Sequence, residues 1–177
     1  SLLEEVEKTL RKIVEDSDRE IKRVSKKNKE TVKRLEELMR EVNRRSTEIV
    51  KRIRDSDLRT EELKRLEEEA RKLNDESREI LERVTRESER LDRELKKHAD
   101  ESRERAKDLI RRLKKLGDKE MLDRIIEEAK RLHEENKRKL EEVERRSEEL
   151  LKELKRRLEE LIKRNDDLLR EVEERKR

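Results

Sequence analysis

The feature that most constrains the fold is a stripe of apolar and small residues that recurs every three or four positions along almost the whole chain. From Val6 to Ile53 the stripe covers 47 residues in 13 steps, or about 3.6 residues per step. That is the period of a straight α-helix, whereas a supercoiled heptad repeat has a period of about 3.5. The stripe therefore predicts long, amphipathic and nearly untwisted helices.

The composition agrees with this prediction. The 177 residues include no Pro and one Gly, so the residues that break helices are almost absent. Charged residues make up 60% of the chain and hydrophobic residues 28%, a balance that resembles disordered chains. However, Glu, Lys, Arg and Leu are strong helix formers, and interleaving of the two signs leaves a net charge of only +4. We therefore expect ordered helices.

Several classes of function are excluded by what the sequence lacks. Without Cys the chain has no disulfide, thiolate nucleophile or Cys-based zinc site. Without Phe, Trp and Tyr it has no platform for stacking nucleic-acid bases, and one Gly cannot build a glycine-rich phosphate loop. Lys and Arg are spread along the chain and accompanied by Glu, whereas nucleic-acid binding needs clustered basic residues. We expect no cofactor and no nucleic-acid partner.

Membrane insertion is also not expected, because no window of about 18 apolar residues exists and acidic residues interrupt the N-terminal apolar positions. The chain is predicted to be soluble, with no natural compartment, and cytoplasmic in an expression host.

Two breaks divide the stripe into near-equal thirds. Gly117 suits a left-handed residue after a helix end, and Asp118 suits the next N-cap. The softer break at 55–57 offers Asp57 as a similar cap, although the stripe also permits a slightly later turn. We predict an all-α, up-down-up bundle of three antiparallel helices forming a single domain over 1–177. The expected elements are helices at about 2–54, 58–116 and 119–177, with turns at 55–57 and 117–118.

Polar residues lie inside or beside the apolar stripes, and in an antiparallel three-helix arrangement they fall at matching depths. Because a buried polar group without a partner costs about 1–3 kcal/mol, this matching predicts hydrogen-bonded layers. The candidates are Ser17, Asn28, Asn43, Ser46, Asn74, Ser88, His98, Ser102, His133, Asn136, Ser147 and Asn165. The expected neighbours are Ser17 with a buried His98 near Asn136, Ser102 with His133, Asn28 with Ser88 and Ser147, Ser46 with Asn165, and Asn43 with Asn74.

The structural interpretation is that these layers specify helix register, because each wrong register leaves buried hydrogen-bond donors and acceptors unpaired. The alternative is a catalytic or metal site around the two histidines. The Glu-x-x-His spacing of dimetal bundles is absent, because Leu95 and Lys130 stand three positions before His98 and His133. A Ser–His hydrolase would also need an oxyanion hole, and continuous helices offer no free backbone N–H. We predict no catalytic residues, no metal ligands and no enzyme.

The chain combines Ser, Asn and His residues in its stripes with three near-equal helices, the minimal loop Gly117-Asp118 and an exterior of Glu, Lys and Arg. In these features it resembles computationally designed helical bundles with buried hydrogen-bond networks. The resemblance implies no natural substrate, cofactor or compartment. The expected function is that of a structural scaffold whose polar layers specify helix register and order. Narrow stripes favour a monomer that requires no partner. The alternative is one component of a designed homo- or hetero-oligomer that presents a helix-binding face, through self-association or a helical partner chain.

Overall fold

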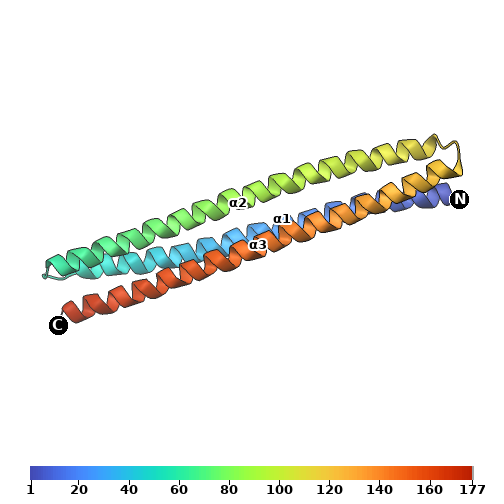
Figure 1. Cartoon of the computed structure of the whole chain (residues 1–177). Helices are drawn as coiled ribbons and strands as arrows, with labels where there is room; N and C mark the ends of the chain where they lie inside the picture. Colours follow the sequence, from blue (N-terminus) through green and yellow to red (C-terminus); the bar gives the residue numbers. More distant parts are fainter. Residues whose placement is uncertain (177) are drawn as a thin grey trace. The chain divides into compact units, whose positions relative to one another are not determined.

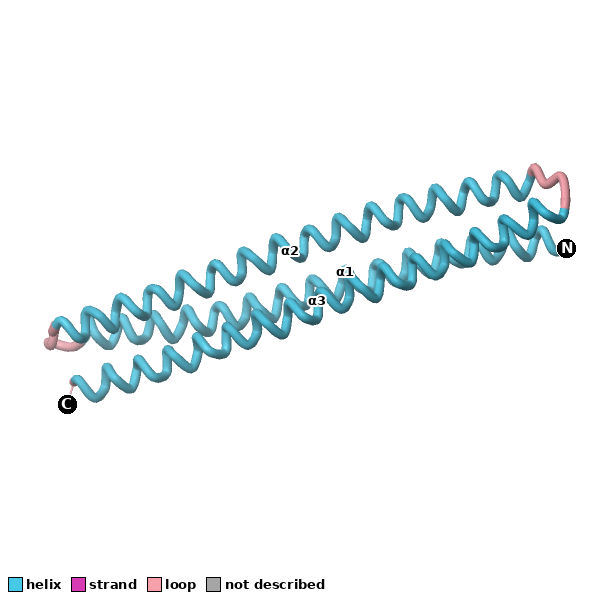
Figure 2. Tube along the Cα trace, viewed as in Figure 1, coloured by secondary structure: helices cyan, strands magenta, loops and turns pink. Residues whose placement is uncertain are grey.

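The chain is an all-α three-helix bundle in a computed structural model that describes residues 1–176. The helices are α1 (Leu2–Asp55), α2 (Glu61–Lys114) and α3 (Lys119–Arg175), and no strand occurs among these residues. Figure 1 labels the three helices, and Figure 2 shows the two loops that join them. The fold class predicted from the period of the stripe is confirmed. None of the helices within 1–176 is both long and apolar enough to cross a bilayer.

The chain divides into two compact units, each built from segments of all three helices. Unit 1 contains residues 1–28 and 89–147, and unit 2 contains residues 29–88 and 148–177. The single domain over 1–177 stays a prediction.

Within each unit α1 and α3 run parallel, and α2 runs antiparallel to both. In unit 1, Ser17 bonds to Asn136 and Asn28 to Ser147, so contacting residues ascend together along α1 and α3. In unit 2, Arg45 pairs with Asp166 and Arg52 with Glu173 in the same order. The antiparallel course of α2 is seen in the pairs Arg103–Asp18 and Ser25–Asp92 in unit 1, and Arg83–Glu153 and Arg175–Glu62 in unit 2.

The core of each unit is made of the predicted stripe residues. In unit 2 they form one continuous apolar cluster that includes Ile49, Leu66 and Leu158. In unit 1 the buried apolar residues form two separate clusters, one around Leu132 and the other around Val143. The exterior carries the charged residues, as expected when an amphipathic helix buries one stripe.

The first loop differs from the prediction. Helix α2 begins at Glu61 rather than 58, and its N-cap is Thr60, whose Oγ1 accepts the N–H of Leu63 at 3.4 Å. The predicted cap, Asp57, lies in the loop, where the neighbouring Ser56 Oγ accepts the N–H of Leu58 at 3.0 Å. The serine turn and the threonine cap together lengthen the connection.

The second loop bears out one prediction and contradicts another. Asp118 caps α3, because its Oδ1 accepts the N–H of Met121 at 2.8 Å. Helix α2 ends at Lys114, before the predicted 116, and Gly117 does not adopt a positive φ. The prediction of a left-handed Gly117 is therefore wrong, since the helix has already ended when the chain reaches it. The predicted end of the third helix at 177 lies outside the described residues.

Because Gly117 has a negative φ and an added Cβ would meet no heavy atom within 4 Å beyond the two neighbouring residues of the chain, Gly117→Ala is expected to stabilise the fold. The gain of about 0.4–1 kcal/mol in the free energy of unfolding comes from the smaller conformational entropy of the unfolded chain. Chemical denaturation measures it. Asp118→Ala is the matched change one residue on, and it should destabilise by about 1 kcal/mol through loss of the cap. A loss of stability in Gly117→Ala would show that this loop does need glycine.

Candidate functional site

A hydrogen-bonded contact in unit 1 joins all three helices. Ser102 on α2 donates its hydroxyl proton to Oδ1 of Asn136 on α3 at 2.6 Å. Nδ2 of Asn136 donates to Oγ of Ser17 on α1 at 2.9 Å. Ser102 and Asn136 are buried and Ser17 is half-buried. One amide side chain thus satisfies hydroxyl groups from two other helices.

The two histidines lie elsewhere than expected. His98 is half-buried, and its Nε2 lies 3.5 Å from Oγ of Ser102, one turn along its own helix, rather than against Ser17. His133 is exposed, and Ser102 bonds to Asn136 instead. The cause is the longer first loop, which shifts α2 along α1 and brings Ser102 to the level where His98 was predicted.

A second polar pair in unit 1 joins α1 to α3. The Ser147 hydroxyl donates to Oδ1 of Asn28, and both side chains are buried. Nδ2 of Asn28 has no hydrogen-bond partner among the described residues, so this amide is satisfied only in part. The predicted third member, Ser88, is buried and belongs to unit 2. Its proximity to the pair stays a prediction.

The polar pair in unit 2 is fully buried. Ser46 on α1 donates to Oδ1 of Asn165 on α3 at 2.8 Å, and neither residue has any exposed surface. Nδ2 of Asn165 lies 3.4 Å from the backbone carbonyl of Val42, to which it donates. These two residues were predicted to lie at the same level.

The remaining predicted pair is not brought together by a hydrogen bond. Asn43 is exposed, and Oδ1 of the half-buried Asn74 has no partner within residues 1–176. Instead Ser77, which is buried on the stripe of α2, donates to the backbone carbonyl of Asn74 at 2.7 Å. Asn43 lies beside the stripe of α1 and not on it, so a match of its depth with that of Asn74 is not enough to bring the two side chains together.

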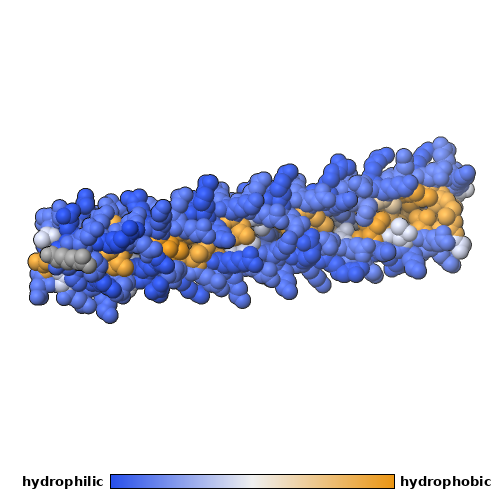
Figure 3. All heavy atoms as spheres, turned by 90° about the horizontal axis from the view of Figure 1, so that it is seen from below, coloured by the Kyte–Doolittle hydropathy of each residue, from blue (hydrophilic) through white to orange (hydrophobic). Residues whose placement is uncertain are grey.

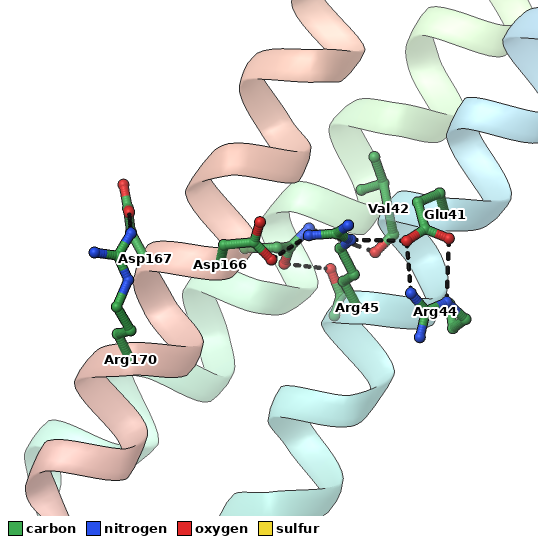
Figure 4. Close-up of polar contacts among 9 residues, drawn as sticks. Glu41, Val42, Arg44, Arg45, Asp166, Asp167 and Arg170 are labelled. Carbon is green, nitrogen blue, oxygen red and sulfur yellow. Dashed lines mark hydrogen bonds and ion pairs between the residues drawn. The ribbon is translucent and has the colours of Figure 1, made fainter.

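Ion pairs across the helix seams were not predicted individually. In unit 2, Arg45 reaches from α1 to Asp166 on α3 and also bonds to Glu41 of its own helix (Figure 4). Arg44 bonds to Glu41 as well, and the two guanidinium groups, Arg44 first, lower the pKa of Glu41 to about 2. The sequence gives little indication of these ion pairs, because most exposed positions of all three helices are charged.

In unit 1 the corresponding cluster lies around Glu144 of α3. Its carboxylate accepts hydrogen bonds from Arg23 at 3.1 Å and from Lys27 at 2.6 Å, both on α1. These bonds, that of Arg23 being the stronger influence, lower the pKa of Glu144 to about 2. The cluster ties α1 to α3 next to the buried Asn28–Ser147 pair.

The arrangement offers little for catalysis. The Ser102 hydroxyl is buried and donates its proton to Asn136, so it is neither accessible nor activated by His98 as a nucleophile would be. In the described part of the chain, no three His, Asp or Glu side chains gather in a way that could hold a metal ion. Ser17, Ser102 and Asn136, Asn28 and Ser147, and Ser46 and Asn165 instead form hydrogen bonds with one another across helices.

Comparison with known proteins identifies no relative: no family model, no curated protein and no solved structure matches the chain.

Replacing one member of the Ser46–Asn165 pair should cost more than replacing both. Asn165→Leu leaves the Ser46 hydroxyl buried without a partner, which is expected to lower the free energy of unfolding by about 1–3 kcal/mol. Adding Ser46→Ala removes the orphaned group and should recover most of the loss. Urea unfolding of both variants and of Ser46→Ala alone completes the cycle. Strictly additive effects would mean that the two side chains are not coupled.

The Glu144 cluster predicts a specific acid response. A lowered pKa means that the stabilisation is complete above pH 4.5 and is lost as the pH falls from 4.5 towards 2. Glu144→Gln should therefore remove about 1 kcal/mol of stability at pH 7 and flatten the fall in that range. Thermal unfolding between pH 2 and pH 7 measures both effects, with Glu141→Gln as the control, because exposed Glu141 forms no ion pair in the described part of the chain. An unchanged acid slope in Glu144→Gln would contradict the assignment.

Proposed function

We propose that the chain is a designed structural scaffold without a natural biochemical activity, in which buried Ser and Asn pairs specify how the third helix packs on the first. The observation that carries this proposal is the placement of the pairs. Ser17–Asn136, Asn28–Ser147 and Ser46–Asn165 all connect α1 to α3, at the same sequence separation of 119 residues.

The connectivity explains why this helix pair needs them. Short loops join α1 to α2 and α2 to α3, and each loop limits the register of the two helices that it connects. No loop joins α1 to α3. With an apolar stripe alone, α3 could slide along α1 by one turn, about 5.4 Å, and still bury similar side chains.

A polar pair changes the energy of that slide. A one-turn slip removes the partners of a buried hydroxyl and a buried amide, and each orphaned group costs about 1–3 kcal/mol. The pair adds little to the stability of the correct register, because apolar residues of the same volume would pack as well. Its contribution is selectivity among registers, which suits a scaffold and gives no role in binding or catalysis.

A second candidate function has one observation in its favour. In unit 1 a groove between α1 and α3 is lined by apolar side chains such as Val6 and Ile126, which the bundle leaves partly exposed. This feature favours the oligomer component, which presents an apolar face to another helix.

The scaffold proposal is tested by exchanging the polar pairs for apolar residues and measuring register directly. The variant carries two kinds of substitution. Ala replaces Ser17, Asn28, Ser46, Ser102 and Ser147, and Leu replaces Asn136 and Asn165. We expect its free energy of unfolding to be equal or higher. Spin labels at exposed Lys51 and Glu171 should give one narrow distance in the parent and a broadened or multiple distribution, displaced by about one helical turn, in the variant.

Ser77→Ala is the matched control, because the Ser77 hydroxyl bonds to a backbone carbonyl of its own helix and joins no two helices. It should keep the narrow distance of the parent. A single narrow distance in the apolar variant would show that apolar packing and the two loops set the register without the polar pairs, and the proposal would fail.

A further inference from the structure

The groove in unit 1 is a hollow of about 670 Å³ between the first turns of α1 and the segment 126–134 of α3. Its apolar lining comes from Val6, Leu10 and Ile13 on one side and from Ile126 and Ala129 on the other. Figure 3 shows the hydrophobic surface that lies open near the N-terminal end of the chain. Leu10 and Ala129 are buried at its base, whereas Val6, Ile13 and Ile126 are half-buried.

The rim of the groove differs from the rest of the α1–α3 seam in how its charges are used. Beyond the groove, Glu144 is bonded to Arg23 and Lys27 across the seam. Along the groove itself, no ion pair between α1 and α3 occurs in the part of unit 1 that the structure describes. The side chains of the rim residues Glu5, Lys12, Lys130 and Glu134 line the hollow and form no hydrogen bond or ion pair with another residue of 1–176, whereas Asp16, which also lines it, is bonded to Arg19 of its own helix.

These four rim charges comprise two acids and two bases around an apolar floor. A surface of this kind is complementary to itself, which is the requirement for an isologous contact between two copies of one chain. A partner with a single sign of charge would leave half of the rim opposed by like charges, a costly arrangement. Lys12 of α1 and Glu134 of α3 carry opposite signs on opposite sides of the hollow.

We propose that a second copy of this chain packs on the groove, with the α1 segment of each copy lying parallel on the α3 segment of the other. The proposal goes beyond the scaffold function. It places four helix segments around one apolar interior, with the two-fold axis parallel to the helices. Both copies would then contribute Val6, Leu10 and Ile13 from α1, and Ile126 and Ala129 from α3, to a shared core.

The charge pattern supports this arrangement at the register already used within each chain, where α1–α3 side-chain contacts join residues 117–123 positions apart. At separations of 120–122 positions, Lys12 lies opposite Glu134 of the second copy, and Asp16 lies opposite its Lys137. Val6 lies opposite Ile126 of the second copy. Two pairs of opposite charge and one apolar pair therefore coincide at nearly the same separation.

An antiparallel dimer is the main competing arrangement. It would stack α1 on α1, with Lys12 opposite Glu5 of the second copy, and α3 on α3, with Lys130 opposite Glu134. A single charge reversal at Lys12 or Glu134 weakens either dimer, so the equimolar mixture of the two variants is the measurement that distinguishes the arrangements.

The test is sedimentation equilibrium of the full chain and two charge-reversed variants, Lys12→Glu and Glu134→Lys, up to roughly 100 µM. The parent is expected to dimerise. Each single variant places like charges at both symmetry-related contacts, so its dimer dissociation constant should rise by about tenfold or more. An equimolar mixture should restore the parent affinity, because each copy then supplies the sign that the other lacks at both contacts.

Both substitutions lie at exposed helical positions and exchange strong helix formers, and circular dichroism verifies that each variant is folded. Lys155→Glu, the same charge change at an exposed position of unit 2, is the control and should leave the dimer unchanged. A monomeric parent throughout the range would overturn the proposal. Single variants that dimerise like the parent would also overturn it, because they would show that these charges do not face the second copy. A mixture that does not recover the parent affinity would overturn it as well and would indicate the antiparallel dimer. Neither result depends on the register measured by the spin labels in unit 2.

Discussion

The packing of α3 on α1 is the constraint on which the rest of this bundle depends, because it is the only helix pair that no loop connects. Its register has to come from side chains. In unit 1, Asn136 bonds to Ser17 and Ser147 bonds to Asn28, and in unit 2 Ser46 bonds to Asn165. Apolar burial drives the helices together but does not distinguish well between registers that differ by one turn. In the function proposed above, the polar pairs supply that distinction.

The same pairs account for how the core of unit 1 is divided. The contact of Ser17, Ser102 and Asn136 lies between the apolar cluster around Leu132 and the cluster around Val143. An amide that bonds to hydroxyl groups from two helices removes most of the desolvation cost that a polar layer brings. The pair with Asn28 is less complete, since its Nδ2 has no partner in the described part of the chain. The Asn28–Ser147 pair therefore keeps part of the desolvation cost of its amide.

Much of the fold follows from the sequence alone. The period of the stripe and the two breaks predict three helices, and the matching depths of Ser46 and Asn165 predict that these two residues lie at one level. The position of His98 was not predictable, because it depends on the length of the first loop, and the Thr60 cap that lengthens this loop looks like an ordinary polar residue. The prediction of a left-handed Gly117 is wrong because α2 ends at Lys114, three residues earlier. Glycine permits a left-handed conformation but does not require it.

The groove in unit 1 lies between α1 and α3 although the stripes of both helices are narrow. The stripes of α1 and α3 are as narrow in unit 1 as in unit 2, and a narrow stripe favours a self-contained bundle. Whether a seam closes depends on the side chains at its edges. In unit 2, Arg45 and Arg52 extend across the seam to carboxylates on α3, whereas along the groove the short side chains of Thr9 and Ala129 line the hollow. Charges that remain unpaired beside an open apolar floor are available to another surface. A second copy carries both signs, which is why we propose it as the partner of this groove.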